Sequence, residues 1–214
     1  MTLPLFAEPP RAPIRLGPQA VVLCGFALPL VPALLPTLAL VEAAAPFRHM
    51  KTRGGHTMSA AMTNCGPLGW TSDEDGYRYA TRDPLTSRLW PEMPAAFVSL
   101  ARDAATAAGF ADFRPDACLV NRYAPGARLT LHQDRNERDF GAPIVSVSLG
   151  IPAVFQFGGD ERSDPVQRVR LVHGDVAVWG GVDRLRFHGV EPLLAETHPL
   201  CGAFRINFTF RQAG

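Results

Sequence analysis

The stretch Phe204-Arg-Ile-Asn-Phe-Thr-Phe-Arg211 alternates strictly between apolar and polar side chains. Successive side chains of a β-strand point to opposite faces, so this stretch predicts a strand with one apolar, mostly aromatic face and one polar face. The apolar face belongs in a hydrophobic core. The polar face carries Arg205, Asn207, Thr209 and Arg211.

The polar face of this strand bears on what the fold must enclose. If it points into the interior of a barrel or sandwich, unpaired arginines are costly there and need a partner with more than one acidic group. Guanidinium groups bind carboxylates through two parallel hydrogen bonds, which makes a small dicarboxylate the natural candidate. The alternative is an edge strand whose arginines face solvent.

Upstream, the same period of two recurs between Gly, Pro or Asp turns and predicts a series of short strands. They are residues 118–123, 129–134, 144–149, 153–157, 169–172, 175–179 and 186–190, followed by 203–211. This many short strands in about 100 residues indicates an antiparallel double-stranded β-helix, or jelly roll. Between Pro94 and Gly109 the apolar spacing instead predicts a helix at 94–108.

The apolar run at 20–45 is interrupted by prolines and has Glu42 as its single charge. Because a proline inside a helix costs about 3 kcal/mol, we predict a strand at 21–26 and a helix at about 33–45 instead of a membrane span. The expected fold is α+β, a single domain with helices packed on one side of a jelly roll. Its expected segments are an N-terminal extension at 1–18, a helical and loop-rich part at 19–115, and the jelly-roll core at 116–214.

Composition narrows the class of partner and compartment. The chain has 214 residues and a net charge of +1, so a local patch, and not a global basic field, would have to attract nucleic acid. Its four cysteines lie far apart without a Cys-x-x-Cys pair, which predicts reduced thiols in a cytoplasmic protein. The first residues lack the basic segment of a secretory signal.

The segment Leu129-Thr-Leu-His-Gln-Asp134 predicts a metal site. On a strand His132 and Asp134 share one face, with the leucines on the other. A second histidine from a neighbouring strand would complete a set of two histidines and one carboxylate, which leaves three of the six iron positions open. The alternative is a strand that simply exposes two polar residues.

Three downstream histidines compete for the remaining ligand position. His173 lies in a predicted turn and His198 precedes a proline in a polar loop, whereas His188 lies on a predicted strand and can face inward. The pattern favours His188 but leaves the choice open.

Taken together, the His-x-Asp motif, the later His-Gly pair and the Arg-x-Asn-x-Thr-x-Arg strand resemble the AlkB family of 2-oxoglutarate-dependent nucleic-acid demethylases. The resemblance covers nearly the whole chain and is close to the bacterial founding members. It includes Phe47-Arg-His-Met50, Met58-Ser-Ala-Ala-Met-Thr-Asn64, Asn121-Arg-Tyr-Ala-Pro-Gly126, Val178-Trp-Gly-Gly181 and Phe208-Thr-Phe-Arg-Gln212.

This resemblance implies a DNA repair dioxygenase that removes methyl groups from 1-methyladenine and 3-methylcytosine, with RNA as a further candidate. Fe(II) would be held by His132, Asp134 and His188, and 2-oxoglutarate and O2 would be co-substrates. The 2-oxoglutarate would become succinate and CO2 while formaldehyde is released. The residues that match its binding site are Asn121, Tyr123, Arg205, Asn207 and Arg211.

The resemblance also assigns substrate recognition to a nucleotide-recognition lid within 19–115. A flipped base would lie between Trp70 and the ring of His132, and single strands should be preferred because flipping costs least there. The residues expected to contact substrate are Trp70, Tyr77, Tyr79, Asn136 and Arg162, with Arg128 and Arg135 as further candidates for phosphate.

Two departures from the family pattern bear on the substrate. Bacterial members tend to carry an acid two places after the metal-binding aspartate, where this chain has Asn136, and the acids of residues 73–75 lie beside Trp70. A neutral amide attracts a cationic base less than a carboxylate does, and the acids would repel a nucleic-acid backbone nearby.

We expect a monomer whose partner is alkylated nucleic acid and which does not associate with a membrane. The alternatives are a 2-oxoglutarate oxygenase acting on protein or small molecules, and a non-catalytic β-sandwich that binds nucleic acid.

Overall fold

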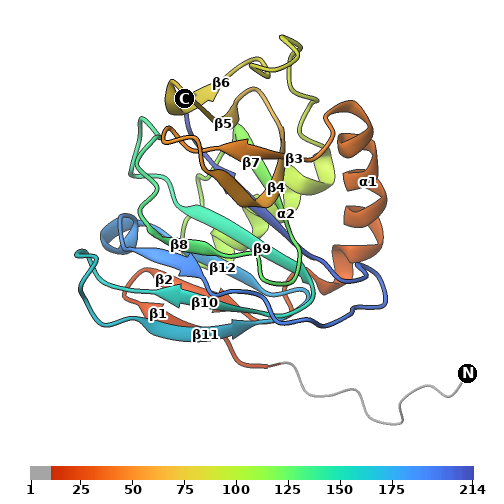
Figure 1. Cartoon of the computed structure of the whole chain (residues 1–214). Helices are drawn as coiled ribbons and strands as arrows, with labels where there is room; N and C mark the ends of the chain where they lie inside the picture. Colours follow the sequence, from red (N-terminus) through yellow and green to blue (C-terminus); the bar gives the residue numbers. More distant parts are fainter. Residues whose placement is uncertain (1–10) are drawn as a thin grey trace, which may run out of the picture.

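The computed structural model of the protein describes residues 11–214 and contains two sheets and a separate hairpin (Figure 1). The eight-stranded sheet has the order β1 (Ile14–Gly17), β2 (Ala20–Leu23), β12 (Val176–Trp179), β9 (Ile144–Gly150), β14 (Arg205–Arg211), β7 (Ala117–Tyr123), β4 (Thr57–Cys65), β3 (Arg48–Lys51). The four-stranded sheet has the order β11 (Gln167–Leu171), β10 (Ala153–Phe157), β13 (His188–Val190), β8 (Leu129–His132). The hairpin consists of β5 (Gly69–Asp73) and β6 (Gly76–Ala80).

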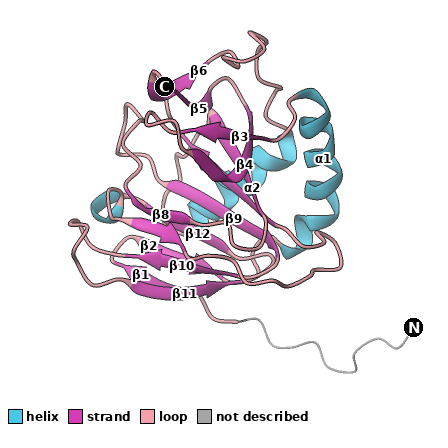
Figure 2. Ribbon diagram, viewed as in Figure 1, coloured by secondary structure: helices cyan, strands magenta, loops and turns pink. Residues whose placement is uncertain are grey.

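Both helices, α1 (Val31–Ala44) and α2 (Ala95–Ala107), pack on one face of the large sheet (Figure 2). Phe97 of α2 meets Phe208 edge to face, with ring centroids 4.9 Å apart. The opposite face of the sheet packs on the four-stranded sheet, where the ring centroids of Phe155 and Trp179 are 5.8 Å apart. The predicted α+β arrangement, with helices on one side of a double sheet, is confirmed.

Strand β14 lies in the middle of the large sheet, between β9 and β7. All of its side chains are buried, so the prediction of an interior polar face is confirmed and the solvated edge strand is wrong. Phe204 differs from expectation: it precedes the strand and is 39% exposed, because the apolar face in contact with the helices begins at Ile206.

The sheet draws strands from both sides of residue 116. Strand β4 pairs with β7, and β2 pairs with β12. Part of the predicted N-terminal extension also belongs to the sheet, because Ile14–Gly17 forms β1; residues 1–10 lie outside the described part. The apolar run splits into β2 and α1 as predicted, and no helix within residues 11–214 is long and apolar enough to cross a membrane.

Candidate metal and co-substrate site

Two antiparallel strands of the small sheet bring the predicted metal ligands together. His132 of β8 is the register partner of His188 of β13, and Asp134 follows two residues after β8 ends. The Asp134 carboxylate oxygens lie 3.4 Å from His132 Nε2 and 3.7 Å from His188 Nε2. The ligand atoms of all three residues lie within 4.8 Å of one another. One prediction fails here, because Leu129 does not back the site: β8 is an edge strand and Leu129 is 38% exposed.

Backbone carbonyls orient both imidazole rings. Nδ1 of His132 lies 3.0 Å from the Thr130 carbonyl, and Nδ1 of His188 lies 3.0 Å from the Arg186 carbonyl. A carbonyl only accepts, so each Nδ1 carries the proton and each Nε2 presents a lone pair to the centre of the cluster. This is the second contact by which proteins orient metal-binding histidines.

The charge states of the cluster also suit a cation. Burial raises the pKa of the Asp134 carboxyl, but Arg211 and the two histidines outweigh it and hold that pKa well below its usual range. Burial, together with His132, lowers the pKa of His188 to about 3. The cluster therefore offers a carboxylate and a neutral buried imidazole at neutral pH, the forms that bind divalent metals.

The other two histidines weighed in the sequence also meet, but in a different way. His173 and His198 stack with ring centroids 4.1 Å apart, and Cys201 lies beside them. Their Nδ1 atoms accept backbone N–H groups, from Gly150 at 2.9 Å and from Leu200 at 3.2 Å. Nε2 then carries the proton in each neutral ring, because Nδ1 is occupied by the backbone N–H group. This cluster fastens a loop to the sheet.

Arg205 is a buried guanidinium with unused donors. It is 2% exposed, lies 5.1 Å above the Tyr123 ring and donates from Nη2 to Ser148 Oγ at 2.9 Å. Its Nε and Nη1 have no hydrogen-bond partner within residues 11–214. Burial lowers the pKa of Arg205, which is the mark of a cation that lacks an anionic partner.

Arg211 carries the second set of donors. Its Nη2 and Nε donate to Asp134 Oδ2 at 2.7 and 3.1 Å, and its Nη1 has no partner among the described residues. Burial lowers the pKa of Arg211, but Asp134, Tyr79 and Glu137 together raise it by more. Both arginines of β14 thus keep free N–H groups in a buried space, which fits a bound dicarboxylate such as 2-oxoglutarate.

The amides expected beside the co-substrate bind each other. Asn121 Nδ2 donates to Asn207 Oδ1 at 3.4 Å, and Asn207 Nδ2 donates to Ser146 Oγ at 2.8 Å and to the Val147 carbonyl at 2.9 Å. Thr209 Oγ1 also donates to Asn207 Oδ1, at 3.0 Å. The Asn207 amide is thus occupied by the sheet in this arrangement, and Tyr123 packs under Arg205.

The aromatic residues of the hairpin lie over the loop that follows Asp134. Trp70 stacks on Tyr77 with centroids 5.6 Å apart, and its Nε1 donates to Asn136 Oδ1 at 3.3 Å. Tyr79 donates to Glu137 Oε1 at 2.6 Å. A hollow of about 310 Å³ is lined by Tyr77, Tyr79 and Asn136 together with the C-terminal residues, which lie beside the hairpin in Figure 1.

The remaining substrate candidates lie at the surface. Arg162 is exposed and lies 5.1 Å above the Phe187 ring. It belongs to the loop between β10 and β11 of the small sheet, whereas the hairpin forms a separate sheet. The acids at the hairpin turn are partly neutralised, because Arg78 forms an ion pair with Asp73 at 2.6 Å, which lowers the Asp73 pKa. The repulsion expected from three acids is therefore reduced to that of Glu74 and Asp75.

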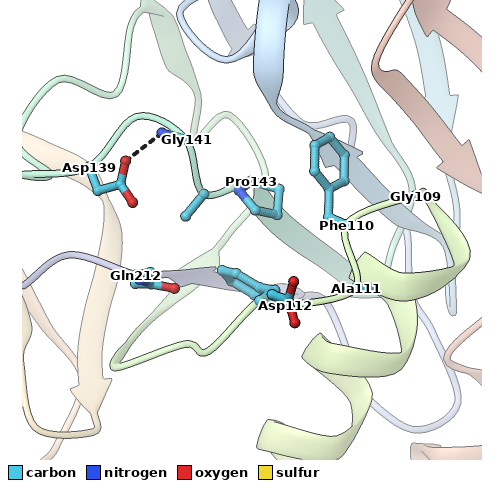
Figure 3. Close-up of a pocket in the computed structure, with 10 residues that line it drawn as sticks. Gly109, Phe110, Ala111, Asp112, Asp139, Gly141, Pro143 and Gln212 are labelled. Carbon is cyan, nitrogen blue, oxygen red and sulfur yellow. Dashed lines mark hydrogen bonds between the residues drawn. The ribbon is translucent and has the colours of Figure 1, made fainter.

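A second hollow of about 420 Å³ contains none of the candidate residues (Figure 3). It lies between the turn after α2, where Phe110 and Asp112 are labelled, and the segment from Asp139 to Pro143. It shares with the site the far end of the loop that follows Asp134, and its lining also includes Gln212, the residue after Arg211.

Two residues of the site were missed in the sequence. Glu137 and Arg184 form a buried ion pair at 3.0 Å behind Asp134. They lie 47 positions apart and belong to no periodic pattern, so no sequence signal marked them.

The double sheet, the His-Asp-His cluster and the buried arginines define an iron and 2-oxoglutarate oxygenase. Residues 33–211 match the family model of the 2OG-Fe(II) oxygenase superfamily. Within it the chain belongs to the AlkB family. It is 60% identical over 211 residues to the alpha-ketoglutarate-dependent dioxygenase AlkB of Salmonella typhimurium, covering 99% of this chain and 98% of the relative.

Further relatives agree with this placement. The AlkB of Escherichia coli is 57% identical, covering 97% of this chain and 95% of the relative. The solved structure of OsALKBH1 superimposes with a TM-score of 0.81 at 30% identity, covering 94% of this chain and all of that one (100%). The protein is therefore an Fe(II)- and 2-oxoglutarate-dependent dioxygenase, and the non-catalytic β-sandwich is set aside.

Proposed function

We propose that this protein repairs alkylated nucleic acid by oxidative demethylation of N-alkylated bases such as 1-methyladenine and 3-methylcytosine. The main support is the 60% identity to a bacterial AlkB over nearly the full length of both chains. The same chain brings His132, Asp134 and His188 together beside two buried arginines. The methyl group would leave as formaldehyde, with 2-oxoglutarate and O2 converted to succinate and CO2. We further propose that it acts as a monomer in the cytoplasm, where its four free cysteines would stay reduced.

The chain's own residues would divide the work as follows. His132, Asp134 and His188 would hold Fe(II), which when bound supplies the oxidising chemistry. Arg205 and Arg211 would hold the carboxylates of 2-oxoglutarate with their free N–H groups, and Tyr123 would keep the Arg205 guanidinium in place from below. Burial of this space keeps bulk water away from the reacting groups.

The hairpin of β5 and β6 would act as the nucleotide-recognition lid. It carries Trp70 and Tyr77 over the loop after Asp134, and Tyr77 is 48% exposed and free to meet a base. Asn136 would contact the base edge, and Arg162 would meet a phosphate. A single-stranded substrate spares the cost of unpairing the base, so single strands would be preferred.

Turnover on a methylated oligonucleotide tests this function. Purified protein with Fe(II), 2-oxoglutarate and O2 should remove the methyl group from single-stranded DNA containing 1-methyladenine or 3-methylcytosine, releasing formaldehyde in equal amount. Conversion of 2-oxoglutarate that no methylated DNA or RNA base stimulates would contradict it and would favour a protein or small-molecule substrate.

Removing the Trp70 ring should weaken substrate binding selectively. Stacking of a base on an aromatic ring contributes about 1–3 kcal/mol, so Trp70→Ala should raise the KM for the oligonucleotide by about 5- to 140-fold. The KM for 2-oxoglutarate should stay unchanged, and Trp70→Phe should recover most of the loss. Equal changes in both KM values would show that Trp70 only supports the fold.

Restoring an acid at position 136 should shift lesion preference toward cationic bases. An aspartate there keeps the acceptor for Trp70 Nε1 and adds a charge worth about 1 kcal/mol at 4 Å in water, or roughly fivefold. We expect Asn136→Asp to raise the ratio of kcat/KM for 3-methylcytosine over a neutral methylated base by about that factor. Competition between two labelled oligonucleotides measures the ratio, and an unchanged ratio would place Asn136 outside base recognition.

A further inference from the structure

A buried arginine from outside the strands helps to fasten the loop that runs from the metal-binding carboxylate to β9. Arg184 is 2% exposed and contacts this loop at three points. Its Nη1 donates to the Asp134 carbonyl at 3.0 Å, its Nη2 to Glu137 Oε2 at 3.0 Å, and its Nε to the Ala142 carbonyl at 3.1 Å. The rigid fork of the guanidinium makes such a three-point contact possible, and no other side chain offers five donors in this geometry.

The local sequence explains how Arg184 reaches this position. It follows a short 3-10 helix, η2 (Gly181–Asp183), at the end of β12. Gly180 allows the close approach, because a Cβ there would lie 2.7 Å from the Phe110 ring. Buried Asp183 holds the turn by accepting the Gln19 N–H at 2.6 Å. Arg184 is thereby fixed to the large sheet while its head group lies on the loop.

Glu137, the carboxylate that Arg184 contacts, also interacts with Tyr79 and Arg211. Tyr79 donates to its Oε1 at 2.6 Å, and Arg211 Nε lies 3.3 Å from the same oxygen. Arg211 also holds Asp134, at 2.7 Å. Two buried carboxylates and two buried arginines thus share one network, in which Arg211 lies between both carboxylates and Arg184 contacts only the carboxylate of Glu137.

We propose that Arg184 is a positioning residue that neutralises Glu137 and so leaves Arg211 available for Asp134 and for a carboxylate of the co-substrate. Without Arg184, Glu137 is a buried carboxylate whose nearest cation is Arg211, and such a charge draws in the cation. Arg211 then turns from Asp134 toward Glu137, and its free Nη1 moves with it. This inference rests on the proposed role of Arg211 in binding 2-oxoglutarate.

Binding of 2-oxoglutarate to the Mn(II)-loaded protein, measured by calorimetry, tests this role without turnover. Arg184→Gln should weaken 2-oxoglutarate binding by about 10- to 100-fold, the usual effect of removing a group that orients a ligand-binding residue. Arg184→Lys keeps the charge beside Glu137 and should retain most of the affinity. The matched control is Arg168→Gln, which breaks an ion pair with Glu191 at 2.7 Å on β11 and does not touch the loop or the turn that carries Arg184.

The double variant Glu137→Gln/Arg184→Gln separates positioning from a merely structural role. Once Glu137 is neutral it no longer draws Arg211 away, so the double variant should bind 2-oxoglutarate at least about tenfold more tightly than Arg184→Gln does. Thermal unfolding of each variant shows whether it is folded. A double variant that binds as weakly as Arg184→Gln, or an Arg184→Gln that binds like the Arg168→Gln control, would overturn the proposal. Wild-type protein that binds no 2-oxoglutarate would overturn the proposed function itself.

Discussion

Asp134→Ala should abolish turnover and, in metal-free protein, also lower the free energy of unfolding by about 3 kcal/mol. The carboxylate has two roles in the structure. It closes the His-Asp-His cluster, and it accepts two hydrogen bonds from the buried guanidinium of Arg211. Its removal leaves Arg211 with Glu137 at 3.3 Å as its nearest anion. A buried charge that loses its partner is strongly destabilising, and Glu137 offsets only part of that cost.

His132→Ala is the matched control for this prediction. The His132 side chain is 31% exposed and contacts Asp134 within the cluster. Unlike Asp134, it is not the partner of a buried arginine within the described residues. It should lose Mn(II) binding and turnover as completely as Asp134→Ala, while its urea midpoint in EDTA stays near that of the wild type. If both variants unfold at the same urea concentration, the pair of Asp134 and Arg211 contributes nothing to stability.

The strands of the catalytic half could be read from the sequence because their pattern is local. A period of two with turn residues at both ends is a property of each segment alone, and each of the strands predicted after residue 116 is present, with ends displaced by no more than two residues. The same alternation favoured an interior strand at β14 but also fitted an edge strand with solvated arginines. The structure decides between them by placing β14 between β9 and β7 with all of its side chains buried.

The placement of the metal ligands depended on information that strands share only after pairing. The pattern placed His132 and Asp134 together but left His188 as one of three histidines, and it is the register of β8 against β13 that brings His188 opposite His132. The same pairing makes β8 an edge strand, which exposes Leu129 against expectation. Register between strands more than fifty residues apart has no local signal.

The support behind the site was invisible in the sequence for a further reason. Glu137 and Arg184 look like ordinary surface charges, because charged residues are rarely buried and nothing in their neighbourhoods is periodic. Only the packed structure shows that Arg184 donates hydrogen bonds to the Asp134 carbonyl and to the Glu137 carboxylate. Family resemblance indicates the residues expected to bind the co-substrate, whereas the residues that hold them in place are found only from three-dimensional contacts.

Arg205→Met should stabilise the protein in the absence of 2-oxoglutarate and at the same time remove its ability to bind it. Arg205 is buried with Nε and Nη1 unpaired among the described residues, and burial lowers its pKa. Replacing such a cation by an apolar side chain of similar length removes a desolvation cost, so we expect a gain of about 1–2 kcal/mol. For a chain of this size that corresponds to a rise in Tm of roughly 2–8 °C.

Addition of 2-oxoglutarate and Mn(II) should reverse the order of stability. At a ligand concentration about 100 times its Kd, wild-type protein gains about 2.7 kcal/mol from binding, whereas Arg205→Met gains little because its Kd for 2-oxoglutarate rises by about 100-fold or more. Arg122→Met is the control, since Arg122 forms its ion pair with Glu42 at 2.8 Å outside the site and should leave the response to 2-oxoglutarate unchanged. An Arg205→Met protein that is less stable than wild type without ligand would mean that Ser148 and the Tyr123 ring already compensate the buried charge. In that case the unpaired N–H groups of Arg205 would not indicate a binding site for a carboxylate.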